Sequence, residues 1–113
     1  MIGFDLLVGH LVGDYILQND WMARNKKDRS LPCFVHCALY TLAVAAFSLF
    51  RVPLPWLAFV FVTHYAVDRS QVIAWWMKFN GQVSFARALA PWSSIVVDNV
   101  WHIVVLWIVA QFV

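Results

Sequence analysis

Three histidine–aspartate pairs in this chain share one spacing, four residues, and each pair lies in a hydrophobic segment. The pairs are His10 and Asp14, His64 and Asp68, and Asp98 and His102. Residues four apart lie on one face of a helix, so each pair would present an imidazole beside a carboxylate. These groups bind metals and carry protons, and burying them in apolar helices is costly unless they are paired or coordinated. Their repetition therefore predicts a shared chemical role.

The composition places these pairs in a membrane protein. Hydrophobic residues make up 63% of the chain and charged residues 12%, and the mean hydropathy is +0.72. Soluble domains have about 25% charged residues. A helical crossing needs about 20 residues, so 113 residues allow three or four crossings and little else. The chain, residues 1–113, is predicted to be a single all-α membrane domain.

Four apolar segments predict a transmembrane four-helix bundle with short loops. The prolines fall at or just before the start of a segment, where a missing N–H costs nothing. The first segment has no basic leader and carries Asp5, His10 and Asp14, so we expect a retained helix rather than a cleaved signal peptide. The expected spans are about 2–18, 31–50, 54–76 and 91–113.

The basic residues predict the orientation of these spans. Seven of the eight lie in the connection after the first segment or in the stretch after the third, whereas the connection between the second and third segments carries only Arg51. The positive-inside rule then puts both basic stretches in the cytoplasm and both termini outside. The lipid bilayer is the expected partner. No nucleotide-binding fingerprint is present, and no nucleic-acid partner is predicted.

This orientation brings the polar residues of all four segments to one end of the bundle. The first and third segments run inward, and the fourth runs outward with its motif reversed. Each aspartate should therefore lie about 6 Å closer to the cytoplasm than its histidine. His36, about five residues into the second segment, falls at the depth of the aspartates. We predict one site in the cytoplasmic half, with His10, His64 and His102 as a deeper layer.

Imidazoles and carboxylates together suit a divalent metal. Seven potential ligands exceed the four of a structural zinc site and allow either two ions, or one ion with supporting residues and an acid or base. A bound metal would lower the pKa of water and generate a nucleophile, with Asp14 and Asp98 as the candidate catalytic carboxylates. The predicted ligands are His10, Asp14, His36, His64, Asp68, Asp98 and His102, and the predicted cofactor is Zn, Mn or Fe.

The motifs form a specific combination along the chain. The run HLVGDYILQNDWMARNKK is followed by a histidine early in the next segment, a second H-x-x-x-D and a late D-x-x-x-H. This combination resembles an uncharacterised family of small bacterial and phage multi-span membrane proteins, which is distantly similar to inner-membrane proteins classed as metal-dependent hydrolases. The resemblance covers nearly the whole chain and implies the same seven site residues and a bacterial inner-membrane location. Asn99 stands where the family usually has glutamine, a conservative exchange of amides.

The leading hypothesis is a membrane-embedded, metal-dependent hydrolase that acts from the cytoplasmic side on a phosphoester of a lipid or another amphiphile. Basic residues ring the expected cytoplasmic mouth and could hold an anionic phosphate group. Topology and lipid headgroups account equally well for the same charges. The candidates for substrate binding are Arg24, Lys26, Lys27, Arg29 and Arg69.

Two other classes of function stay open. Chains of aspartate and histidine also mark ion pathways, so the protein could conduct a metal ion or protons. The outer halves of the segments, however, offer little polarity beyond Asp5, Thr41 and Ser48. A non-enzymatic membrane effector of the phage holin or exclusion type is the other alternative, with the buried polar groups only directing assembly. A homo-oligomer is compatible with each of these, because a small bundle could need a second copy to close its site.

Two cysteines flank His36 in the run CFVHC. Their thiolates could add ligands to a zinc ion, but packing of two reduced thiols at a helix interface is the preferred interpretation. A disulfide is disfavoured, because both residues lie on one helical turn near the cytoplasm. A bis-histidine haem site is disfavoured as well, because three carboxylates lie among the histidines.

Overall fold

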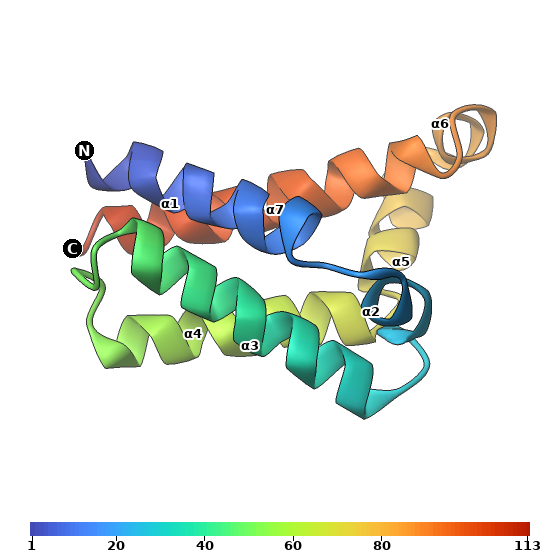
Figure 1. Ribbon diagram of the computed structural model, residues 1–113. Helices are drawn as coiled ribbons and strands as arrows, with labels where there is room; N and C mark the ends of the chain where they lie inside the picture. The colour runs from blue at the N-terminus through green and yellow to red at the C-terminus, as the bar shows by residue number, and fades with distance from the viewer.

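The structure is a computed structural model that describes all 113 residues and consists of helices (Figure 1). Seven α-helices and one short π-helix follow one another, and there is no β-sheet. They are α1 (Ile2–Leu11), η1 (Val12–Ile16), α2 (Asp20–Asn25), α3 (Ser30–Phe47), α4 (Leu54–Arg69), α5 (Val72–Phe79), α6 (Val83–Ala88) and α7 (Trp92–Ala110). The all-α prediction is confirmed.

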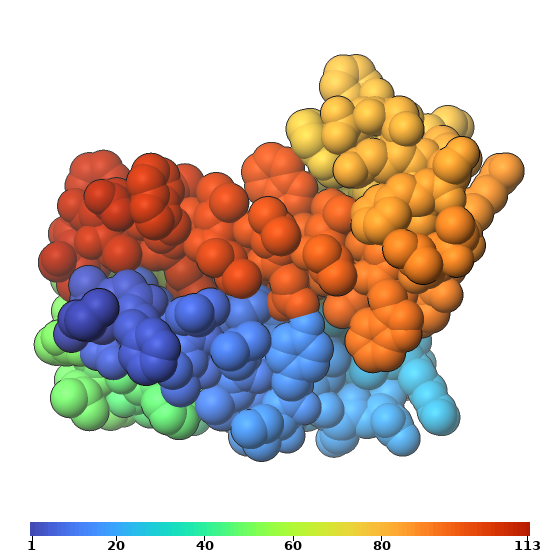
Figure 2. All heavy atoms as spheres, turned by 90° about the horizontal axis from the view of Figure 1, so that it is seen from above, coloured from blue at the N-terminus to red at the C-terminus, as the bar shows by residue number.

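Four long helices lie side by side and form the body of the molecule (Figure 1). Each contacts two neighbours, in the order α1, α3, α4, α7 and back to α1. Both termini and the turn between α3 and α4 lie at one end of this body, and the short helices α2, α5 and α6 lie at the other. In the view from above, α5 and α6 project to one side of α7 (Figure 2). Two helices, α3 and α7, are long and apolar enough to cross a membrane.

The helix bounds differ from the expected segments at the end that carries the short helices. The third expected segment, 54–76, is divided, because α4 ends at Arg69 and Trp75 and Trp76 belong to α5. Ser70 makes this break: its backbone is extended, and its hydroxyl donates to the Ala66 carbonyl and accepts from the Val72 N–H. The connections at this end therefore contain α2, or α5 and α6, and are not the short loops that were expected.

Two glycines, Gly9 in α1 and Gly13 in η1, bring this part of the chain into close contact with α3. A Cβ at Gly9 would lie 2.8 Å from Val44 Cα, and one at Gly13 would lie 2.8 Å from Tyr40 Cδ2 and 3.0 Å from Tyr40 Cα. Small residues four apart allow two helices to approach this closely, particularly in membranes. The motif Gly-x-x-x-Gly contains His10 and is followed directly by Asp14, so the same part of the chain that packs the helices also carries polar groups.

The interior changes character along the bundle. Near the termini it is a cluster of buried apolar side chains, comprising Leu6, Tyr40, Val44, Val52, Val60, Leu106 and Val109. Toward the short helices it is polar. Eight of the 25 buried residues are polar or charged, including all four histidines. Buried groups of this kind need partners, which the bundle supplies by bringing them together.

Candidate metal centre

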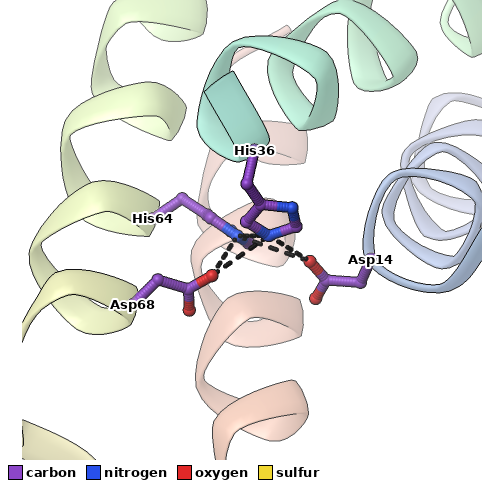
Figure 3. Close-up of side chains that lie close together, drawn as sticks. All are labelled: Asp14, His36, His64 and Asp68. Atoms are coloured by element: carbon purple, nitrogen blue, oxygen red, sulfur yellow. Dashed lines mark hydrogen bonds and ion pairs between the residues drawn. The ribbon is translucent and has the colours of Figure 1, made fainter. Parts of the chain in front are cut away.

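Four side chains from three helical segments point toward one another in the polar half of the bundle (Figure 3). Asp14 comes from η1, His36 from α3, and His64 and Asp68 from α4. The two imidazoles face each other through Nε2 atoms 3.0 Å apart. His36 Nε2 lies 3.1 Å from Asp14 Oδ1 and 3.1 Å from Asp68 Oδ2. His64 Nε2 lies 3.4 Å from Asp14 Oδ1 and 3.0 Å from Asp68 Oδ2.

These four donor atoms have nearly the spacing of a tetrahedral metal shell. Zinc binds nitrogen and oxygen at about 2.0–2.2 Å, so neighbouring donors of a tetrahedral ion lie about 3.3–3.6 Å apart. The five measured separations, 3.0–3.4 Å, fall at or just below this range. Asp14 Oδ1 makes no hydrogen bond although it lies 3.1 Å from His36 Nε2. This oxygen is therefore available to bind an ion. The group Asp14, His36, His64 and Asp68 could therefore hold a divalent metal.

A second group of donors lies beside the first. Asp14, Asp98 and His102 offer ligand atoms that all lie within 4.8 Å of one another. His102 Nε2 is 3.1 Å from Asp68 Oδ1 and 3.3 Å from Asp98 Oδ1. Asp68 therefore directs one oxygen to each group. Six of the seven predicted ligands come together in this way.

Aromatic stacking orients the histidine rings. The ring of His64 lies between Tyr40, at 3.8 Å, and His102, at 3.9 Å, with interplanar angles of 27° and 22°. Metal-bound histidines usually donate their other ring N–H to a partner, but Nδ1 of His36 and of His64 has none. For His64, stacking between Tyr40 and His102 fixes the orientation of the ring instead. Tyr40 was missed by the sequence reasoning, although its place four residues after His36 puts both on one helix face.

His10, the seventh predicted ligand, lies outside both groups. Its Nε2 donates to Asn99 Oδ1 at 2.7 Å, which leaves Nδ1 to accept from the Tyr40 hydroxyl at 2.8 Å. Asn99 also donates to the hydroxyl of Tyr15. Both ring nitrogens of His10 are thus engaged, and Asp14, 3.7 Å away, turns toward α3 and α4 instead. The separation occurs where α1 gives way to the wider turn of η1.

The side chains do not form the deeper layer of histidines that was expected from His10, His64 and His102. His64 Nε2 is 3.0 Å from Asp68, and His102 Nε2 is 3.3 Å from Asp98. Helical side chains point back toward the N-terminus, so the later residue of each pair reaches over the earlier one and closes the axial step between their backbone positions. The histidines and aspartates therefore make one mixed cluster rather than two layers.

Lys26 reaches into this cluster from the connection between α2 and α3. Its Nζ donates to Asp68 Oδ2 at 3.0 Å, and its side chain is 16% exposed. Burial alone would lower the pKa of Lys26, but the charge and the hydrogen bond of Asp68 outweigh burial and raise it. The amine is therefore held in its charged form beside the carboxylate.

The other four predicted substrate-binding residues differ in their surroundings. Lys27 donates to the carbonyl oxygens of Val67, Asp68 and Ser70, and Arg69 donates to those of Lys27 and Asp28. These contacts tie the α2–α3 connection to the end of α4. Arg24 lies on the surface near Asp20, with its side chain 79% exposed, and Arg29 is exposed.

A cavity of about 200 Å³ opens onto the cluster between the end of α4, α5 and α7. Of the five predicted basic residues, Lys26 and Lys27 line it. Its other polar residues are Asp68, Gln71, Ser94 and Asp98. Ile73 separates this cavity from an apolar groove of about 220 Å³ that is walled by Val67, Val72, Trp75, Trp76 and Trp101. The polar cavity beside the donor groups thus adjoins an apolar groove at the surface.

One comparison with known proteins gives a match, and this match covers nearly the whole chain. A family model described as "Protein of unknown function (DUF3307)" matches residues 2–113. No curated protein and no solved structure matches the chain. The matched range includes every donor residue described above, and the family brings no activity with it.

Proposed function

The chain belongs to DUF3307, a family of unknown function, and we propose that it is a multi-span membrane hydrolase that uses a divalent metal. The observation that carries the proposal is the set of four buried donors, Asp14, His36, His64 and Asp68, at separations close to those of a tetrahedral metal shell. A cavity beside them offers access for a substrate. Catalytic metal sites keep a coordination position open to water or substrate, and the side of the cluster that faces this cavity could provide one.

The outer faces of the bundle support a membrane location. Each long helix exposes large apolar side chains, such as Phe4 on α1, Leu42 on α3, Val62 on α4 and Trp107 on α7. A monomeric soluble protein rarely exposes apolar surface on every side. The longest dimension of the molecule, 41 Å, is close to the thickness of a bilayer with its headgroups, about 40–45 Å. We place all four long helices in the bacterial inner membrane.

The distribution of charge supports the proposed orientation. Six of the eight basic residues belong to the connections that carry α2, α5 and α6, and a seventh, Arg69, is the last residue of α4 at the same end. The eighth, Arg51, lies at the opposite end and pairs with Asp5. The positive-inside rule then puts the short helices and the mouth of the cavity in the cytoplasm and the termini outside.

The chemistry divides between the metal and the chain. A divalent metal in this cluster would supply a Lewis acid and a water molecule of lowered pKa. Two cluster carboxylates, Asp68 and Asp98, line the cavity, and Asp98 is the more open of the two, with its side chain 22% exposed against 1% for Asp68. Asp98 can therefore bind a metal through one oxygen and accept the proton of an attacking water through the other. Asp14, whose side chain is 9% exposed, serves better as a ligand.

The cavity and the groove favour an anionic amphiphile as substrate. The amine of Lys26 stands at the cavity wall and can bind a phosphate oxygen once one is present. Beyond Ile73, three tryptophans wall a groove that suits an apolar chain. Their position next to the proposed cytoplasmic mouth is the membrane interface, where tryptophan is enriched. We propose a phosphoester whose head lies in the cavity and whose apolar part lies in the groove.

The alternatives can be weighed against the same features. An ion conduit needs polar groups across the whole bundle, whereas Leu6, Val44, Val60, Leu106 and Val109 fill its outer half. No feature favours conduction over hydrolysis. A non-enzymatic effector would need the buried cluster only for assembly, and this alternative predicts no bound metal.

The test is metal analysis and activity screening of the detergent-purified protein. We expect at least about half an equivalent of Zn, Mn or Fe per chain, a sharp fall in His64→Ala and Asp68→Ala, and no change in Asp20→Asn, whose side chain is 90% exposed. Hydrolysis of amphiphilic phosphoesters should follow metal content. Negligible metal in the wild-type protein would overturn the proposal in favour of an effector.

A further inference from the structure

We infer that the cluster holds two ions, and that the ion bound by Asp98 and His102 at the cavity is the one that acts on the substrate. This inference rests on the proposed function and names the catalytic position within it. Three features carry it: the closure of the first donor group, the two-sided contacts of Asp68, and the openness of the second group.

The first donor group is closed. Asp14, His36, His64 and Asp68 complete the four positions of a tetrahedral ion. The side chains of His36, His64 and Asp68 are at most 1% exposed. An ion with four protein ligands has no coordination position left for water or substrate, as in structural zinc sites. Hydrolysis at this position would require a ligand to leave.

Asp68 connects the first group to the second. Its Oδ2 faces His36 and His64, at 3.1 and 3.0 Å, while its Oδ1 faces His102, at 3.1 Å. Asp14 belongs to both groups as well. A carboxylate whose two oxygens face different donor sets has the arrangement of a bridging ligand. Paired catalytic ions lie about 3.5–4 Å apart, a separation that adjacent groups sharing two carboxylates can support.

The second group is open. Its own residues are Asp14, Asp98 and His102, and Asp98 and Asp68 line the cavity. An ion with three or four protein donors on one side and a cavity of about 200 Å³ on the other keeps positions for water and for a substrate oxygen.

The balance of charge indicates how the two ions should differ. The three aspartates carry three negative charges and Lys26 one positive charge, which leaves two negative charges for the first divalent ion to neutralise. The second ion brings a surplus of positive charge, which an anionic phosphate group can balance. The first ion should therefore bind tightly, and the second more weakly and together with an anion.

The experiment is a metal titration of the full-length protein in detergent with Mn²⁺, followed by elemental analysis and calorimetry, with and without inorganic phosphate. We expect about two equivalents in two affinity classes, with phosphate tightening only the weaker class. Asp98→Asn and His102→Gln should each retain about one equivalent and lose hydrolysis. Asp20→Asn should bind as the wild type does.

The outcomes separate this inference from the proposed function. Saturation of the wild-type protein at one equivalent, with metal-dependent hydrolysis intact, overturns the second ion and leaves the hydrolase. No metal at all overturns both. Should the variants fail to fold, the wild-type protein alone decides: two equivalents of Mn²⁺ should give the electron paramagnetic resonance spectrum of a coupled pair, and the spectrum of isolated ions contradicts the inference.

Discussion

At the scale of single residues, Asp68 does more than any other side chain to hold the cluster together. Its two oxygens contact four partners: Lys26, His36, His64 and His102. It is 1% exposed, so removing its charge would leave a buried lysine and three imidazoles without their shared acceptor. Removing one member of such a buried group costs about 3–5 kcal/mol. Asp68 should therefore be the least replaceable residue of the site for folding as well as for metal binding.

His10 differs from Asp68, because it is equally buried but hydrogen-bonds to Tyr40 and Asn99 outside the two donor groups. We expect His10→Gln to retain full metal content and to lower the stability of the protein by about 1–3 kcal/mol, the cost of a broken buried hydrogen-bond network. Thermal unfolding in detergent and elemental analysis measure the two effects. Loss of metal comparable to that in His64→Ala would return His10 to the ligand set.

The types and spacing of the residues were enough to predict all six donors that the structure brings together, but they also predicted His10, which lies outside both donor groups. They could not predict that His10 would separate from Asp14, because the four-residue rule assumes an α-helix and Asp14 lies in a π-helix. π-turns often occur at functional sites, but nothing in the hydropathy of VGDYI distinguishes one. Likewise, Lys26 looked like its basic neighbours, because its contact with Asp68 depends on a fold across 42 residues.

At the scale of helices, the close approach of α1 and α3 determines where Asp14 lies relative to His36. Gly9 and Gly13 allow that approach, and the Tyr40 side chain that meets Gly13 also stacks on His64. Packing and ring orientation are thus coupled through one tyrosine. A substitution at the helix interface should therefore alter metal binding at the candidate metal centre.

Gly13→Ala tests this coupling. The new Cβ would meet Tyr40, including its Cα at 3.0 Å, and overpacking of this kind costs about 1–3 kcal/mol. We expect lower thermal stability together with weaker metal binding. Gly3→Ala, in the preceding helix α1, is the matched control, because nothing lies within 4 Å of its Cβ position. Equal behaviour of the two variants would show that the contact does not constrain the site.

The apolar groove between α5 and Trp101 of α7 gives a second prediction at the scale of helices. Trp101→Ala should raise KM for an amphiphilic phosphoester at least several-fold and leave hydrolysis of a short, soluble phosphoester unchanged, because only the apolar part loses its contact. Trp107→Ala, on the same helix but remote from the groove, should change neither. Parallel loss of both substrates in Trp101→Ala would mean that the residue supports the fold rather than substrate binding.

The long helices were predictable because apolar runs of this length have few alternatives. The end of α4 was not, because apolar residues resume at Val72 directly after the short polar run 68–71, and the expected span was continued across that run. Helix α5 and its groove were therefore hidden inside an expected span. Mean hydropathy measures how apolar a segment is, but it does not show where one helix ends and the next begins.

At the scale of the whole molecule, the two ends carry different chemistry, and their orientation can be tested. We expect an impermeant thiol reagent to label Leu54→Cys in intact cells, and Arg24→Cys only after lysis, in a background with Cys33 and Cys37 replaced by alanine. Both labelling positions are well exposed, at 77% and 79%. The opposite pattern would put the metal centre on the outer side of the membrane.

The apolar half of the bundle has an electrical consequence. Moving one charge through 100 mV across a membrane changes its energy by about 2.3 kcal/mol. In the proposed orientation, the side chains packed around Val44 and Val60 insulate the outer half, so most of the transmembrane voltage falls there. The aspartates then sit close to the electrical potential of the cytoplasm. A divalent ion can enter and leave their site at nearly constant affinity, whether the membrane is energised or not.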